Sequence, residues 1–202
     1  MKKIDYKKEF KNLYSAKKGK PELVVVPALN YLAVQGAGAP GDDNFKHAIE
    51  ALFTLAYTLK FMVKKSELAI DYGVMPLQGL WWAEDMSQFS VEKKQDWLWQ
   101  IMIMQPELIN KKLINQALTQ AKQKKPELPL DTIEFIKFKE GKCAQVLHQG
   151  PFAEEGPTIQ ALHQFIHGQG LALRDKHHEI YLNDFNRTAP EKLRTIIRQP
   201  VA

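Results

Sequence analysis

The order of predicted secondary-structure elements repeats in the two halves of the chain. In each half a pair of apolar strands ends at a glycine, Gly36 or Gly150, and a loop and an amphipathic helix follow. Each half also closes with an apolar strand ending in Gln-Pro, at 105–106 and at 199–200. Although few residues are identical, the shared order predicts a duplicated β-β-α-β-β unit over residues 21–105 and 131–202. Residues 106–125 are then a helical connector within one domain, 21–202.

Such a duplication predicts an α+β fold, with an antiparallel sheet, helices on one face and a ligand groove on the other. The apolar pattern places strands at 23–26, 30–36, 73–82, 97–104, 132–139, 142–148, 178–182 and 195–201, and helices beginning at Asn44, Pro106 and Pro157. Pro27 is predicted to form the turn of the first hairpin, and Glu140-Gly141 the turn of a hairpin in the second half.

Composition limits the class of protein. With 202 residues, 45% of them hydrophobic, the chain can bury a substantial core. The single cysteine, Cys143, excludes a disulfide framework and a multi-cysteine metal site, and it is expected to be buried in a strand. No apolar run reaches the roughly 18 residues of a membrane span, and residues 1–10 lack the apolar segment of a secretory signal. We therefore expect a soluble, reduced, cytoplasmic protein without membrane attachment.

The net charge of +5 comes from one terminal segment. Residues 1–20 contain eight lysines against Asp5 and Glu9, a net charge of +6, so the rest of the chain sums to −1. These lysines could contact phosphates, but a solvated, partly helical arm explains them more simply. The charge therefore predicts a basic arm over residues 1–20 and does not indicate nucleic-acid binding.

Two short motifs resemble cofactor sites without meeting their requirements. Residues 36–41 satisfy G-x-G-x-x-G, but Pro40 and Asp42 precede the helix, which puts a carboxylate where a pyrophosphate would bind. His163 and His167 share a helix face at i and i+4, yet glutamine replaces the glutamate of H-E-x-x-H and no third ligand follows. Surface histidines are the simpler interpretation, and we expect neither a metal nor a cofactor.

Four tryptophans, Trp81, Trp82, Trp97 and Trp99, fall within nineteen residues on two strands that are predicted to pair. Period-two alternation places Trp97 and Trp99 on one face and sends Trp81 and Trp82 to opposite faces. A wall of indoles facing an open groove would bind flat, apolar or cationic molecules by stacking and cation–π contact. Core packing stays an equally good explanation for any single one of them.

The strand near the C-terminus carries a carboxylate in its middle. Ile180 and Leu182 are expected to face the helices, which leaves Glu179 and Tyr181 together on the opposite face. Shielded by aromatic rings, Glu179 would be suited to act as a base. The alternative, which the pattern supports as well, is an exposed strand glutamate without a role.

Several segments together resemble the GyrI-like small-molecule-binding domains. These are residues 24–36, residues 145–152, the strand Glu-Ile-Tyr-Leu at 179–182 and the tail Arg-Thr-Ala-Pro-Glu-Lys-Leu at 187–193. The resemblance covers about residues 21–202, without a DNA-binding domain fused to them. It implies a tandem SHS2-like pair of modules related by a pseudo-twofold axis, with a groove between them. In this sequence the acid on the groove floor corresponds to Glu179.

Two segments are most similar to one subfamily, the cyclopropanoid cyclopropyl hydrolases. They are residues 7–14, Lys-Lys-Glu-Phe-Lys-Asn-Leu-Tyr, and residues 75–81, Met-Pro-Leu-Gln-Gly-Leu-Trp. These enzymes open the strained cyclopropane of DNA-alkylating natural products by adding water, and their activity depends on an aromatic cage. The resemblance implies a detoxifying hydrolase with Glu179 activating water and Tyr181 or Tyr72 donating a hydrogen bond to the substrate carbonyl. The candidate cage residues are Trp81, Trp99, Tyr72, Tyr57, Phe152 and Tyr181.

Two other functions stay open at this point. The first is a non-catalytic protein that sequesters or senses small hydrophobic, aromatic or cationic compounds, acting with a separate transcription regulator because no helix-turn-helix is present. The second is a module that binds a topoisomerase, as the family name suggests, although no acidic, DNA-mimicking face supports it.

Overall fold

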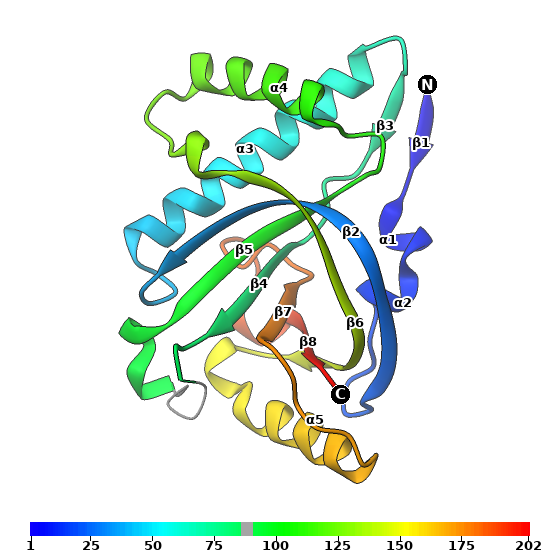
Figure 1. The fold of residues 1–202 in the computed structure, drawn as a ribbon, viewed down its shortest axis with the longest axis vertical. Coiled ribbons are helices and arrows are strands. Elements are labelled where there is room, and N and C mark those ends of the chain that lie inside the picture. The colour runs from blue at the N-terminus through cyan, green and yellow to red at the C-terminus, as the bar shows by residue number, and fades with distance from the viewer. Residues whose placement is uncertain (86–90) are drawn as a thin grey trace. The chain divides into compact units, whose positions relative to one another are not determined.

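Two long strands occupy the positions of the two predicted hairpins. In the computed structural model, which describes residues 1–85 and 91–202, β2 (Glu22–Ala37) and β6 (Glu134–Gln149) are continuous strands of sixteen residues (Figure 1). The hairpin predictions at Pro27 and at Glu140-Gly141 are therefore wrong. Tight hairpin turns need residues with positive φ, and neither Pro27 nor its successor has one. Gly141 has φ +80°, but this single residue does not reverse the strand.

The chain divides into two compact units, each assembled from three segments. The first unit contains residues 1–9, 29–75 and 82–138, and the second contains residues 10–28, 76–81 and 139–202. Strands β2 and β6 each begin in one unit and end in the other. These boundaries differ from those of the predicted repeats, 21–105 and 131–202. Antiparallel strand pairs and helices occur in both units, so the protein is a mixed α+β structure, as the sequence predicts.

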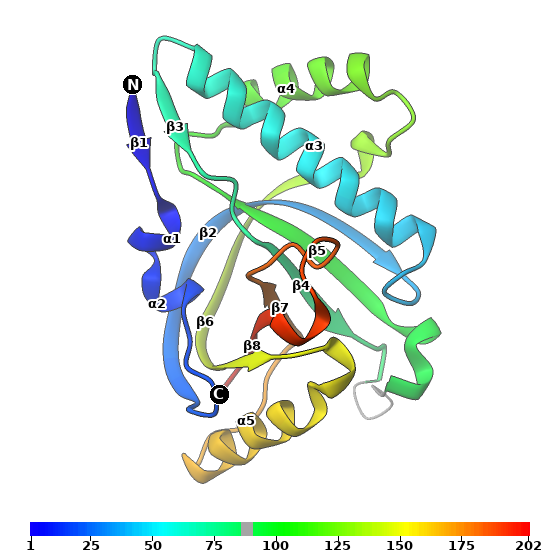
Figure 2. The same cartoon turned by 180° about the vertical axis from the view of Figure 1, so that it is seen from behind.

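In the first unit a long helix covers an antiparallel strand pair. The end of β2 pairs with β5 (Leu98–Gln105), and α3 (Asp43–Lys65) packs against β5 with the predicted apolar stripe buried. Figures 1 and 2 show α4 (Lys111–Lys124) alongside α3. The remaining elements are the parallel pair β1 (Lys2–Ile4) and β3 (Ile70–Tyr72), the short helix α1 (Tyr6–Glu9) and the 3-10 turns Val91–Asp96 and Leu130–Thr132.

The start of α4 differs from the sequence prediction. The side chain of Asn110 caps the helix by accepting a hydrogen bond from the backbone N–H of Leu113 at 3.1 Å. Pro106 lies before the helix, where its carbonyl accepts a hydrogen bond from the N–H of Ile109. Asparagine satisfies the free N–H groups of a first turn, which proline at that place does not, so the helix begins after Asn110.

In the second unit four antiparallel strands lie in the order β4, β7, β8, β6. Their bounds are β4 (Leu77–Trp82), β7 (His177–Tyr181) and β8 (Arg194–Pro200), with the second part of β6. Helix α5 (Gly156–Gly168) packs Leu162 and Ile166 against Val146 and Ile197 of the sheet. Shorter elements are α2 (Lys11–Tyr14) and the 3-10 turns Phe152–Glu154 and Pro190–Lys192.

The predicted basic arm is partly packed. All eight of its lysines are exposed, as a solvated arm requires, whereas Leu13 and Tyr14 are buried in the second unit. Arg198 donates a hydrogen bond to the Leu13 carbonyl at 2.6 Å. The prediction that Cys143 is buried in a strand is confirmed. Among the helices that the structure describes, none combines the length and apolar character that a membrane span requires.

Candidate functional site

The Glu179 carboxylate is held by two neighbours on its own strand. The Tyr181 hydroxyl donates a hydrogen bond to Oε2 at 2.8 Å, and His177 Nε2 lies 3.1 Å from Oε1. Two-residue spacing along β7 puts all three side chains on one face of the sheet. The Glu179 side chain keeps 15% of its surface exposed, so the carboxylate is fixed in position and still reachable from solvent.

This face of the sheet is not the one that the sequence suggested. Glu179 lies directly opposite Ile197 in the β7–β8 pair, and opposed residues share a face. Because Ile197 packs against α5, the prediction that Glu179 faces away from the helices is wrong for α5. The prediction assumed one polar and one buried face, but His178 and Ile180 on the other side of β7 are fully buried too.

Trp81 extends the hydrogen-bonded chain on the neighbouring strand. Its indole N–H donates to the Tyr181 hydroxyl at 3.1 Å. The indole fits because Gly79, opposite Glu179 in the β4–β7 pair, has no side chain. A Cβ at Gly79 would lie 2.7 Å from Trp81 Nε1 and 3.0 Å from the Tyr181 oxygen. A chain of donors therefore runs from Trp81 through Tyr181 to Glu179.

Two phenylalanines surround the ring of Tyr181. Phe152 and Phe185 meet it edge to face, with ring centroids 5.7 Å and 5.8 Å away, and lie 6.0 Å from each other. Phe152 is 41% exposed, so part of this aromatic cluster is available for contact with another molecule. The second unit thus brings four predicted site residues together: Trp81, Phe152, Glu179 and Tyr181.

A second carboxyl group, Glu155, belongs to the same site and was missed from the sequence. It precedes α5, is 5% exposed, and lies near the Thr195 side chain, which favours its charged form. Burial, together with the nearby Glu179 carboxylate, raises the pKa of Glu155 to about 9. A glutamate just before a helix is usually solvated, so nothing in the sequence marks Glu155. His177 had a usable signal, because the period-two rule puts it beside Glu179.

The predicted site residue Trp99 lies in the first unit. Its ring covers Gly36, where a Cβ would come within 2.2 Å of it, and it meets Phe45 edge to face at 5.1 Å. Trp99 and Trp81 are each 2% exposed. Neither therefore forms the open wall of indoles that the sequence suggested, because Trp99 is packed over Gly36 of the opposing strand and Trp81 over Gly79 of its own strand.

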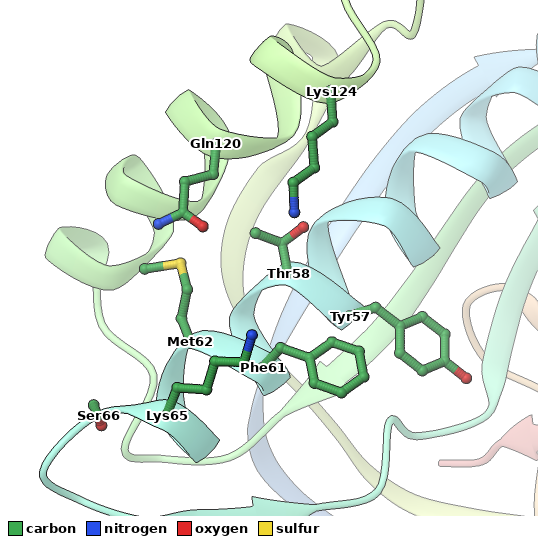
Figure 3. Close-up of a pocket in the computed structure, with 8 residues that line it drawn as sticks. All are labelled: Tyr57, Thr58, Phe61, Met62, Lys65, Ser66, Gln120 and Lys124. Atoms are coloured by element: carbon green, nitrogen blue, oxygen red, sulfur yellow. The ribbon is translucent and has the colours of Figure 1, made fainter.

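Tyr72 and Tyr57 are also in the first unit and occupy separate places. Tyr72 is buried with its ring 6.3 Å from that of Tyr6. Tyr57 is 48% exposed on α3, where its ring stacks on Phe61 at 6.4 Å. Figure 3 shows Tyr57 and Phe61 at a hollow between α3 and α4, with Lys124 across it. The hollow has a volume of about 550 Å³.

Behind the site, on the opposite face of β7, lies a buried polar network. His178 Nδ1 is 2.8 Å from Glu140, and Arg198 contacts the same carboxylate at 3.4 Å and Gln145 Oε1 at 2.9 Å. Burial raises the pKa of Glu140, but His178 and Arg198 outweigh this effect and hold the pKa below its usual value. On the other side of His178, Gln78 links the network to Tyr14.

The two motifs that resemble cofactor sites have local roles. Asp42 Oδ2 accepts a hydrogen bond from the Ala39 N–H at 3.0 Å, so the carboxylate stabilises the turn before α3. Burial lowers the pKa of His163, and the nearby His177 and His167 lower it further. Over residues 1–85 and 91–202, no group of three or more histidine, cysteine, aspartate or glutamate side chains is arranged to hold a metal ion.

A comparison with protein families identifies a match that covers most of the chain. The model of the GyrI-like small molecule binding domain matches residues 19–202. The chain belongs to the GyrI-like family. This confirms the resemblance seen in the sequence and identifies the protein as carrying a small-molecule-binding domain. No curated protein matches the GyrI-like chain significantly.

Solved structures agree with this assignment. An uncharacterized conserved protein from Listeria innocua is 39% identical, covering 98% of this chain and 100% of its own, with a TM-score of 0.92. A Listeria innocua protein described as a hydrolase is 38% identical over 100% of both chains, with a TM-score of 0.90. The EcmrR C-terminal domain is only 13% identical over 91% of this chain and 97% of its own, with a TM-score of 0.56, and shares the fold alone.

Proposed function

We propose that this GyrI-like protein binds flat hydrophobic xenobiotics beside Glu179 and hydrolyses the cyclopropane ring of cyclopropanoid DNA-alkylating compounds. The observation that carries the proposal is the Glu179 carboxylate, held by Tyr181 and His177 next to aromatic rings. A base that removes a proton from water needs this combination of fixed position and solvent access. The similarity to a Listeria innocua protein described as a hydrolase supports a reaction as well as binding.

In the proposed reaction Glu179 accepts a proton from a water molecule. The water oxygen forms a bond to the ring methylene, and the bond from that methylene to the quaternary ring carbon breaks. Its electron pair moves through the conjugated system to the carbonyl oxygen, which becomes that of a phenol. Release of ring strain favours the step, so the protein supplies orientation and proton transfer. Tyr181, whose hydroxyl donates to Glu179, acts as a positioning residue.

The proposed contacts to the planar substrate come first from Phe152, which has exposed ring surface, and from Trp81. Trp99, Tyr72 and Tyr57, the other aromatic residues proposed to contact ligands, belong to the first unit. The duplicated origin of the fold and a cytoplasmic, detoxifying role are further parts of this proposal. Its competitor is a protein that binds or sequesters drugs without changing them, or that senses ligands for a transcription regulator.

Mass spectrometry of a spirocyclopropyl cyclohexadienone incubated with the protein separates these functions. The wild-type protein is expected to release a product heavier by one water, with tryptophan fluorescence changing in the same samples. Glu179→Gln should lower turnover by about 10²-fold or more, the usual contribution of a general base. Glu191→Gln, an exposed glutamate in the second unit, is the matched control and should behave like the wild type.

Two results would contradict the proposal. Turnover by Glu179→Gln at the wild-type rate would show that Glu179 is not the base. A fluorescence change without any product from the wild-type protein would show that the protein binds the compound but is not a hydrolase for it.

A further inference from the structure

Glu155 reaches the face of the sheet that carries Glu179. Thr195 on β8 lies directly opposite Tyr181 on β7 and opposite His148 on β6, so these three side chains share that face. The Thr195 side chain and the Glu179 carboxylate both influence the charge of the Glu155 carboxyl, so Glu155 lies near them. Glu155 comes from the segment before α5, so a different part of the chain brings a second carboxyl to the same place.

One oxygen of the Glu155 carboxyl is unused. Oε1 is buried and has no hydrogen-bond partner among residues 1–85 and 91–202. An unpaired buried carboxylate oxygen is costly, whereas a protonated carboxyl loses less on burial. This agrees with the pKa of about 9, to which burial and the Glu179 carboxylate raise this group. At neutral pH Glu155 therefore carries a proton and has a free atom that can take part in a new hydrogen bond.

The groups around Glu155 do not supply a competing charge pair. On β7 the neighbours are Glu179 and Tyr181. Burial raises the pKa of Tyr181 well above its usual value, and the Glu179 carboxylate raises it further. On β6 the His148 ring lies 3.0 Å from the Thr158 hydroxyl and 3.1 Å from the Pro151 carbonyl. The adjacent Glu154 is exposed to solvent. After burial, the Glu179 carboxylate, which is itself 3.1 Å from His177 Nε2, has the largest effect on the pKa of Glu155.

Ring opening needs a proton at a second point. Negative charge builds up on the substrate carbonyl oxygen while water is deprotonated elsewhere, and a neutral donor at that oxygen stabilises the transition state. The hydroxyl of Tyr181, which the sequence suggested for this role, already donates to Glu179. The site therefore needs another donor.

We propose that Glu155 is this donor, a second catalytic residue that gives its proton to the substrate carbonyl oxygen while Glu179 takes one from water. This inference rests on the proposed function and deepens it. The Glu155 O–H bond breaks and the phenol O–H bond forms, while the hydroxyl of water joins the ring methylene. Glu155 is left as a carboxylate and Glu179 as an acid, and a proton returned from Glu179 to Glu155 through solvent restores the site. The net change is the addition of one water.

Two carboxyl groups in one site with opposite protonation states form an acid–base pair. The protonated member of the pair donates to an acceptor oxygen, so the inference also names the substrate class, a flat molecule with a hydrogen-bond acceptor at the end of its conjugated system.

The first test is the pH dependence of turnover with the spirocyclopropyl substrate. The wild-type kcat/KM is expected to fall above about pH 9, as Glu155 loses its proton. Glu155→Gln keeps a hydrogen-bond donor but no transferable proton, and should lose about 10²- to 10⁴-fold in kcat and the alkaline decline. Glu154→Gln, the exposed neighbour, should match the wild type at every pH. Wild-type turnover by Glu155→Gln, or an unchanged alkaline decline, would overturn the inference.

A binding experiment tests the role of Glu155 without relying on turnover. Acridone presents one carbonyl on a flat neutral ring system, and 9,10-dihydroacridine lacks it. By calorimetry, the wild-type protein should bind acridone about tenfold more tightly than dihydroacridine at pH 7, and this preference should vanish at pH 10. Glu155→Gln should keep the preference at both values. If the wild-type protein forms no product, the hydrolase proposal is wrong. If its preference for acridone does not change with pH, Glu155 is not the donor.

Discussion

Gly79 lies directly opposite Glu179 in the β4–β7 pair, and the indole of Trp81 occupies the space that a side chain at Gly79 would fill. This absence of a side chain lets Trp81 reach Tyr181, which in turn holds Glu179. A glycine thereby controls the position of a carboxylate with which it shares no hydrogen bond.

Gly79→Ala is expected to displace Trp81 and break its hydrogen bond to Tyr181. Overpacking of this kind costs about 1–3 kcal/mol. Thermal unfolding and ligand titration followed by tryptophan fluorescence should show a lower midpoint and about tenfold weaker affinity. Gly73→Ala is the control, since a Cβ there meets no atom within 4 Å. If both variants behave alike, the close approach at Gly79 has no functional role.

Tyr181→Phe removes a hydroxyl that both accepts from Trp81 and donates to Glu179. The Trp81 N–H and the Glu179 carboxylate each lose one hydrogen bond, which should lower stability by about 1–3 kcal/mol and kcat more than it changes KM. Tyr14→Phe breaks a comparable buried hydrogen bond, to Gln78, away from Glu179. Equal loss of kcat in the two variants would mean that the effect is one of stability alone.

Glu155→Gln should stabilise the fold while it removes activity. In the unfolded chain this carboxyl ionises near pH 4.5, but in the folded protein it stays protonated up to about pH 9. The wild-type protein therefore loses stability as pH rises from 4.5 toward 9, by an amount on the order of 3 kcal/mol at pH 7. Denaturant unfolding should show a gain for Glu155→Gln at pH 8 that shrinks at pH 5. A gain that does not vary with pH would contradict burial of a protonated Glu155.

Glu140 has the opposite pH dependence. Its pKa is held below the usual 4.5 by His178 and Arg198 against the effect of burial. Its contribution to stability is therefore present above about pH 4.5 and is lost as pH falls through the lower pKa of the folded state. Glu140→Gln should cost about 3–5 kcal/mol at pH 7 and flatten this acid decline. Glu134→Gln, exposed on the same strand, should retain the wild-type profile.

Local patterns predicted the helices and several strands because each depends on nearby residues. The apolar stripe of α3 and the apolar residues of β5 and β8 are found where the sequence suggests. The hairpin at Pro27 is absent because strand continuation depends on a partner strand distant in sequence, which no local signal reveals. Glu179 and Tyr181 share a face as predicted, whereas the role of His178 was invisible, since a buried histidine needs Glu140 from another strand. Glu155 likewise comes near Thr195 and Glu179, which are distant in sequence, only in the folded chain.

The chain crosses between the two units five times, at residues 9, 28, 75, 81 and 138. Any single cut between residues 9 and 139 therefore leaves at least one unit without a segment. Neither unit can be produced as one contiguous fragment, so truncation series and domain transplants will give incomplete proteins. The separated segments must also find each other over long sequence distances, which slows folding. The glutamates of the site and the glycine that faces them can thus be studied only in the intact chain.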